Sequence, residues 1–179
     1  ELLACGARVD EINTLRRHLD RLKGGGLARS AFPAQIVSLI LSDVVDNSLE
    51  SIASGPTAPD SSARVDALGV LEKYNLVEKV SGAILDALRT NPETPKPGDR
   101  LFERVQNVIV GSNALAVESA LGQARSEGFH SYSLGSDWQG EARTVGGELS
   151  RRLRRSSEPR PFCLIAGGET TVTLRGRGR

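Results

Sequence analysis

Short apolar runs alternate with helical segments along most of this chain, and that alternation constrains its fold more than any other feature. Ile36–Leu41 and Val105–Val110 are short and rich in β-branched side chains. Runs of this kind favour buried strands of a parallel sheet. Two further strands and two helices are expected at 130–134, 162–166, 114–127 and 142–154. Strands that alternate with helices predict an α/β fold, a Rossmann-like sandwich around a parallel sheet.

The N-terminal half is expected to be mainly helical. Residues 2–5 are expected to end one helix, and Asp10 is a suitable N-cap for the next. The apolar residues of that second helix recur at the helical spacing of three and four, and they are Ile12, Leu15, Leu19 and Leu22. Asp60 is expected to cap a third helix, and a fourth is expected near 77–88. The proline-rich segment 91–98 predicts a boundary between two partial lobes.

Composition limits the classes of function. The chain has 39% hydrophobic and 25% charged residues and a net charge of +1, so there is no electrostatic case for nucleic acid or a membrane surface. No apolar stretch approaches the roughly 20 residues that cross a bilayer. Cys5 and Cys163 lie among apolar neighbours, and we expect buried, reduced thiols. The basic run 151–155 fits a solvated helix end better than a phosphate-binding patch.

The segment Cys163–Val172 carries the strongest functional signal. Its apolar residues stop at Gly167 and Gly168, and the polar run 169–171 follows. A strand that ends in two glycines lets a ligand approach the backbone closely, because no Cβ stands in the way. Ligands of open α/β sheets collect at the carboxyl ends of strands. We therefore expect this segment to line a ligand site.

Two more polar clusters accompany it. Asp43 stands just after the carboxyl end of the 36–41 strand. An acid there holds a metal, accepts a proton or caps nearby backbone, and its position alone favours a functional role and a structural role equally. Asn13 and Arg16 lie one helical turn apart and so share a face, which is more commonly a solvated basic face than a binding site. The remaining polar and small residues of these clusters are Ser42, Lys23, Ser54, Gly55 and Thr57.

Familiar catalytic motifs are missing from the chain. It contains no P-loop, no His-Glu-x-x-His zinc motif, no Gly-x-Ser-x-Gly elbow and no Gly-x-Gly-x-x-Gly fingerprint. His18 and His130 are more typical of structural histidines than of catalytic ones. Cations, hydroxyls, glycine amides and acids at strand ends suit phosphoryl transfer, because that chemistry depends on positioning and charge stabilisation.

Four segments, in this order, resemble the signatures of one family. The pattern of Asn13, Arg16, Leu19 and Lys23 before Gly24-Gly25 resembles a signature of the class II glycerate kinases, the glycerate 2-kinase family whose C-terminal part is called the MOFRL domain. The other matching segments are 40–45 with 52–57 and Asp60, then 93–98 with 107–113, then 167–172 with Gly176 and Gly178. The resemblance covers nearly the whole chain.

The resemblance implies an activity and a domain layout. Family members transfer the γ-phosphate of ATP to the 2-hydroxyl of D-glycerate with a divalent metal, usually Mg²⁺, in a cleft between two α/β domains. Residues 1–98 are expected to be part of the N-terminal glycerate kinase domain, and 99–179 the start of the MOFRL-type domain. The chain is expected to be an internal piece of a longer protein. We also expect a cytoplasmic location, with a mitochondrial one as the alternative, and a possible homodimer. No nucleic-acid or membrane partner is expected.

Roles for single residues follow from the resemblance. Lys23, Asp43 and Arg16 are expected to be catalytic, and Asp43 is also the expected metal ligand. Substrate binding is expected from Asn13, Ser42, Ser54, Gly55 and Thr57. Nucleotide binding is expected from Gly167, Gly168, Glu169, Thr170, Gly176 and Gly178.

The chain departs from the family pattern at two places, and two alternative functions stay open. Asp20 replaces the usual serine, and Asp46-Asn47 replaces the usual Gly-Asp, which puts a metal role for Asp46 in doubt. A further lysine and a Gly-Gly-Arg-Asn stretch of the family site are expected outside this chain. The alternatives are a hydroxypyruvate reductase with a nicotinamide cofactor, and a catalytically inactive product that acts as a binding module.

Overall fold

The computed structural model of the chain describes residues 2–173 and 176, and the chain divides into two compact units. Unit 1 comprises Glu1–Ile40 and Ser48–Val108, and unit 2 comprises Leu41–Asn47 and Ile109–Arg179. The α/β class with parallel strand pairs is confirmed. The assignment of 1–98 and 99–179 to two family domains stays a prediction.

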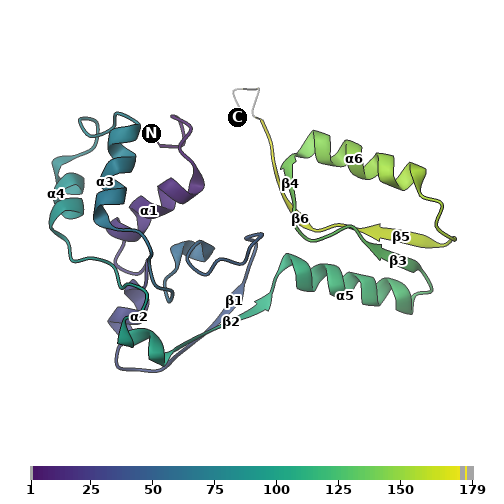
Figure 1. Ribbon diagram of the computed structural model, residues 1–179, viewed down its shortest axis with the longest axis horizontal. Coiled ribbons are helices and arrows are strands. Elements are labelled where there is room, and N and C mark those ends of the chain that lie inside the picture. The colour runs from purple at the N-terminus through teal and green to yellow at the C-terminus, as the bar shows by residue number, and fades with distance from the viewer. Residues whose placement is uncertain (1, 174–175, 177–179) are drawn as a thin grey trace. The chain divides into compact units, whose positions relative to one another are not determined.

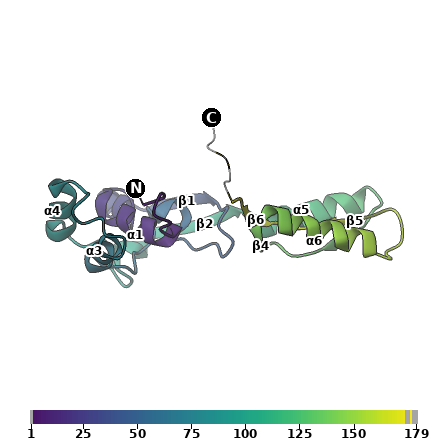
Figure 2. The ribbon, with the colours of Figure 1, turned by 90° about the horizontal axis from the view of Figure 1, so that it is seen from above.

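Unit 1 is a helical body. Its α-helices are α1 (Val9–Leu19), α2 (Gly26–Ala31), α3 (Arg64–Lys73) and α4 (Gly82–Thr90), with 3₁₀ turns at Ile52–Ser54 and Arg100–Arg104. Both views in Figures 1 and 2 show α1 beside α3. The core between α1, α3 and α4 consists of Leu15, Ala67, Val70, Leu71, Leu76 and Leu88.

The start and end of α1 correct two expectations. Residues 2–6 form turns rather than the end of a helix, and α1 begins at Val9, so Asp10 lies in the first turn and is not the N-cap. The Arg8 N–H instead donates to the carboxylate of Glu11 at 2.8 Å. The helix ends at Leu19, so Leu22 lies beyond it. Leu19 and Leu22 are both exposed and do not belong to the buried stripe.

The strands β1 (Ile36–Leu41) and β2 (Val105–Gly111) lie where the sequence predicted strands. Their pairing with each other was not predicted. The expected burial of β1 is wrong on one face. Its residues alternate between half-buried and exposed, and Val37, Leu39 and Leu41 are all exposed.

Unit 2 combines helices with short strands (Figure 1). The strands are β3 (His130–Ser133), β4 (Trp138–Glu141), β5 (Phe162–Ile165) and β6 (Gly168–Thr171), and the helices are α5 (Asn113–Ser126) and α6 (Ala142–Arg155). β3 pairs in parallel with β5, and β4 pairs in parallel with β6. α5 packs on β3 and β5, whereas α6 packs on β4 and β6.

The pair β4–β6 was not expected, and it changes the setting of the double glycine. Gly168 is the first residue of β6 and faces Trp138 across the pair, so the segment is a strand rather than a loop. A Cβ on Gly168 would lie 2.1 Å from the Trp138 carbonyl oxygen. The glycine is therefore required by close strand contact.

Two further observations concern the cysteines and the helices. Cys5 is exposed and Cys163 is half-buried, so the expectation of two buried thiols is wrong; both are free thiols. Within the described part of the chain, no helix is long and apolar enough to cross a membrane.

Candidate functional site

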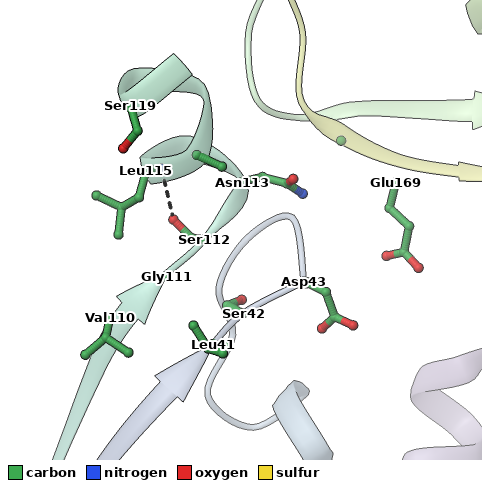
Figure 3. Close-up of a pocket in the computed structure, with 12 residues that line it drawn as sticks. Leu41, Ser42, Asp43, Val110, Gly111, Ser112, Asn113, Leu115, Ser119 and Glu169 are labelled. Atoms are coloured by element: carbon green, nitrogen blue, oxygen red, sulfur yellow. Dashed lines mark hydrogen bonds between the residues drawn. The ribbon is translucent and has the colours of Figure 1, made fainter. Parts of the chain in front are cut away.

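A pocket of about 590 Å³ lies where β1 and β2 end and α5 begins, wholly within unit 2 (Figure 3). Ser42 and Asp43 follow β1, and Ser42 N–H donates to the Gly111 carbonyl at 2.8 Å. This bond holds the two strand ends together. The polar residues that line the pocket are Ser42, Asp43, Ser112, Asn113, Ser119 and Glu169.

The N-terminus of α5 forms one wall of this pocket. Ser112 is the N-cap, and its hydroxyl oxygen accepts a hydrogen bond from Leu115 N–H at 3.3 Å. Helix N-termini carry free N–H groups and a partial positive charge, so they attract phosphates and carboxylates. The sequence analysis placed Ser112 and Asn113 in the family-like segment 107–113 but gave neither a role in a site, although a cap residue between a strand and a helix was the available signal.

Two carboxylates line the same pocket. Asp43 after β1 and Glu169 on β6 are both exposed, and among the described residues neither makes a hydrogen bond or an ion pair. The described residues contain no cluster of three or more metal-ligating side chains. Mg²⁺ is commonly held by one or two carboxylates together with substrate phosphates. Asp43 and Glu169 therefore fit the donor set that Mg²⁺ prefers.

A second polar cluster lies in unit 1 around Asn13. Its side-chain oxygen accepts from Ser54 Oγ at 3.0 Å and from Arg16 Nη1 at 3.1 Å, and Asn13 is buried. These bonds join α1 to the loop before Pro56. The solvated face that was the commoner expectation for Asn13 and Arg16 is therefore wrong for Asn13.

The loop that carries Ser54 has an unusual backbone. Ala53, Ser54 and Gly55 have φ values of 52°, 60° and 62°, all in the left-handed region, which costs free energy for residues with a Cβ. Gly24 N–H donates to the Ser54 carbonyl at 2.9 Å, and Gly25 N–H donates to the Gly55 carbonyl at 2.7 Å. The glycine-rich segment after Lys23 thus holds the loop in this shape.

Thr57 is held by two strand residues that sequence reasoning missed. Its hydroxyl donates to Asn107 Oδ1 at 2.6 Å, Asn107 Nδ2 donates to the Thr57 carbonyl at 3.1 Å, and Ser38 Oγ donates to Thr57 Oγ1 at 3.1 Å. Ser38 lies on β1 and Asn107 on β2. A polar residue inside an apolar strand was the available signal at both positions.

Lys23 lies in a turn that Asp20 organises. The Asp20 carboxylate accepts from Leu22 N–H at 2.8 Å and Lys23 N–H at 3.3 Å, and lies 3.4 Å from Lys23 Nζ. The hydrogen bond from Leu22 N–H is the main cause of the lowered pKa of Asp20. The side chain that departs from the family pattern therefore stabilises this turn.

Asp60 is completely buried and does not cap a helix, which corrects the expectation for it; α3 begins later, at Arg64. Its carboxylate accepts from Ser62 Oγ at 2.6 Å and Thr94 Oγ1 at 2.8 Å, and lies 2.9 Å from Arg17 Nε. Burial favours the neutral acid, but these hydrogen bonds and the guanidinium outweigh burial and lower the pKa of Asp60. Asp60 thus links the Pro-rich segment 91–98, through Thr94, to Arg17 of α1.

The predicted site residues form two groups. In unit 2, the pocket brings together Ser42, Asp43, Gly168 and Glu169, while Thr170 on β6 and Gly176 are exposed. Gly167 precedes β6, and Gly178 lies outside the described residues. In unit 1, hydrogen bonds connect Asn13, Arg16 and Ser54, and the backbone joins Gly55 to the turn after Lys23. Convergence of the two groups on one site stays a prediction.

Comparison with known proteins places these residues in a family context. A domain model described as a domain of unknown function, DUF4147, matches residues 1–89. D-glycerate 2-kinase of Thermotoga maritima is 39% identical over 99% of this chain and 42% of its own length. Glycerate kinase of Macaca fascicularis is 36% identical over 99% of this chain and 55% of its own length.

The crystal structure of Thermotoga maritima glycerate kinase also matches. It superposes with a TM-score of 0.83 at 38% identity, over 99% of this chain and 42% of that protein. A Pyrococcus horikoshii structure matches with a TM-score of 0.76 at 36% identity, over 99% of this chain and 42% of that protein. The chain thus spans about half the length, or less, of the relatives it matches. The agreement of the whole chain in sequence and in fold places it in the glycerate 2-kinase family.

Proposed function

We propose that the protein containing this chain phosphorylates D-glycerate at its 2-hydroxyl with ATP and forms 2-phosphoglycerate and ADP. The relatives named glycerate kinase and D-glycerate 2-kinase support this reaction. The observation that carries the proposal is the pocket in which Asp43 and Glu169 accompany the N-terminus of α5.

That pocket offers what phosphoryl transfer needs. The free N–H groups and the partial positive charge at the start of α5 suit a phosphate group. The carboxylates of Asp43 and Glu169 suit Mg²⁺, which would neutralise charge on the phosphates when bound. Ser42 and Ser112 add hydroxyl groups at the same edge.

Asp43 is the best candidate for the proton-accepting role. In the proposed reaction the 2-hydroxyl oxygen of glycerate bonds to the γ-phosphorus, the bond to the ADP oxygen breaks, and the hydroxyl proton passes to a base. An exposed carboxylate without a competing partner can accept that proton or help hold the metal. Arg16 and Lys23 are assigned to the carboxylate of glycerate or to the transferring phosphate, because guanidinium and ammonium groups pair with such anions.

The reaction is tested by which cofactor is consumed. The protein is mixed with D-glycerate, ATP and Mg²⁺, and ADP is measured; a second mixture contains hydroxypyruvate and NADH, and the loss of NADH is measured. The proposal expects ADP in the first mixture and unchanged NADH in the second. Loss of NADH with hydroxypyruvate would instead support the reductase. If neither ADP forms nor NADH is lost, the result would support a binding module.

A further inference from the structure

We propose that a second pocket, which we call the α1–α2 pocket, binds a small anion with two or more negative charges, a phosphate or a dicarboxylate. It has a volume of about 590 Å³ and is lined by the end of α1, the turn after it, α2 and the segment 91–94. Its charged and buried polar lining residues are Arg17, His18, Asp20, Arg21, Arg29 and Thr94. All of them lie in unit 1. Asn13, Arg16 and Lys23 are not among its lining residues, so the inference does not depend on the proposed function.

The charge of the lining favours an anion. Three arginines line the pocket, against a single aspartate. The Arg17 guanidinium is already balanced, because it lies 2.9 Å from Asp60 Oδ1 and 3.6 Å from Glu50 Oε1. Arg21 and Arg29 are exposed, and neither forms an ion pair with a described carboxylate. Two guanidinium groups therefore remain for a ligand.

The opposing charges near the pocket are weaker than these two cations. The Asp20 carboxylate accepts two backbone N–H groups of its own turn and pairs with Lys23 at 3.4 Å, so its charge is compensated. The C-terminus of α1 contributes a partial negative charge of about half a unit. Arg21 and Arg29 together exceed that charge, and guanidinium groups can hold phosphate or carboxylate oxygens with paired hydrogen bonds.

One of the two arginines is held in place before any ligand arrives. Arg29 Nη1 donates to the Glu93 carbonyl at 3.0 Å, which leaves its other N–H groups available. Glu93 is itself fixed, since its carboxylate lies 3.2 Å from both Arg64 Nε and Lys96 Nζ. A side chain that is already ordered loses less conformational entropy on binding.

Buried polar side chains line part of the pocket. The His18 side chain is 1% exposed, and its Nδ1 donates to the Thr14 carbonyl at 2.9 Å. Thr94 donates to the buried Asp60, which also holds Arg17. Arg17, His18 and Thr94 are buried in the absence of a ligand, so this side of the pocket does not need to form when a ligand binds.

Isothermal titration calorimetry of the protein at low ionic strength tests the inference. Inorganic phosphate and succinate are titrated separately, so the two arms distinguish a phosphate ligand from a dicarboxylate. The variants are Arg21→Ala and Arg29→Ala, and the matched control is Arg104→Ala, an exposed arginine of unit 1 that does not line the pocket. Melting curves verify that each variant is folded.

We expect at least one of the two anions to bind, and each pocket variant to weaken the Kd about tenfold, the loss of one charge-assisted contact. Arg104→Ala should stay within about twofold of the wild type, and added salt should weaken binding. An Asp43→Asn variant should bind the anion normally even if it is inactive, which separates this inference from the proposed kinase activity. Absence of binding for both anions, or binding that the two pocket variants leave unchanged, would overturn the inference.

Discussion

Arg17 and Asp60 form a buried ion pair, with Arg17 Nε 2.9 Å from Asp60 Oδ1 and side-chain exposures of 8% and 0%. The pair joins α1 to the segment before α3. A buried charge that loses its partner is strongly destabilising. We predict that Asp60→Asn lowers the free energy of unfolding by about 3–5 kcal/mol in urea denaturation. Asp86→Asn, at an exposed position on α4, is the control and should change it by less than about 0.5 kcal/mol. Equal effects of the two variants would contradict the structural role of the pair.

Glu93 gives stability a defined dependence on pH. Burial by itself favours the neutral acid, but hydrogen bonds from Arg64 N–H, Lys96 and the Arg64 side chain outweigh it and lower the pKa of Glu93 from 4.5 to about 2. Because the folded pKa lies below the unfolded one, the stabilisation is complete above about pH 4.5 and is lost as the pH falls towards 2. Unfolding measured in urea across this window should show stability falling with pH.

Substitution of the acid isolates this effect. Glu93→Gln should be less stable than the wild type at neutral pH and should flatten the decline between pH 4.5 and 2. Glu11 acts in the same pH window, because hydrogen bonds from Lys73, Tyr74 and Arg8 N–H lower its pKa to about 2. The double variant should therefore be flatter still, and an unaltered slope in Glu93→Gln would rule out its contribution.

Gly168 is predicted to tolerate no side chain. A Cβ there would lie 2.1 Å from the Trp138 carbonyl oxygen, so β4 and β6 must separate. We expect Gly168→Ala to cost more than about 2 kcal/mol of stability and to shift the fluorescence of Trp138, the sole tryptophan. Gly146→Ala on α6 meets nothing within 4 Å and should stabilise by about 0.5–1 kcal/mol. The prediction fails if Gly168→Ala is as stable as the wild type.

Asn13 is predicted to hold the left-handed loop through Ser54. Asn13→Ala leaves the Ser54 hydroxyl and the Arg16 guanidinium without their acceptor, which should cost about 1–3 kcal/mol of stability. A double-mutant cycle with Ser54→Ala should give a coupling energy of at least about 0.5 kcal/mol. Amide hydrogen exchange at Gly24 and Gly25, which bond to the loop, should accelerate in both single variants. A coupling energy near zero would show that the two side chains act independently.

Asp43 is predicted to affect turnover without affecting stability. If it accepts the hydroxyl proton or holds the metal, Asp43→Asn should lower kcat about 100-fold or more in the ATP and glycerate assay. Its side chain is exposed, so the melting temperature should stay the same. Glu118→Gln, at an exposed position on α5 of the same unit, is the matched control. Turnover at the wild-type rate in Asp43→Asn would remove this residue from the chemistry.

Local patterns in the sequence were sufficient to predict the positions of most of the strands and helices. The strand at Ile36–Leu41 was predicted with the bounds that the structure shows, and β2, β3 and β5 were predicted within about one residue. Apolar runs and helical spacing are properties of neighbouring residues, so they can be read without knowing the fold. The strands β4 and β6 were not predicted, because their sequences, Trp-Gln-Gly-Glu and Gly-Glu-Thr-Thr, contain no apolar run. The two strands form by pairing with each other.

The amino-acid sequence alone was enough to predict the fold class, the family and the position of Asp43 at the end of a strand. The three-dimensional arrangement decided the rest. Asp60 became a buried partner of Arg17 instead of a cap, Asn13 became an acceptor for Ser54, and Glu169 came to line the same pocket as Asp43. The physical reason is that burial, ion pairing and pocket formation depend on contacts between residues far apart along the chain, and no local pattern encodes those contacts.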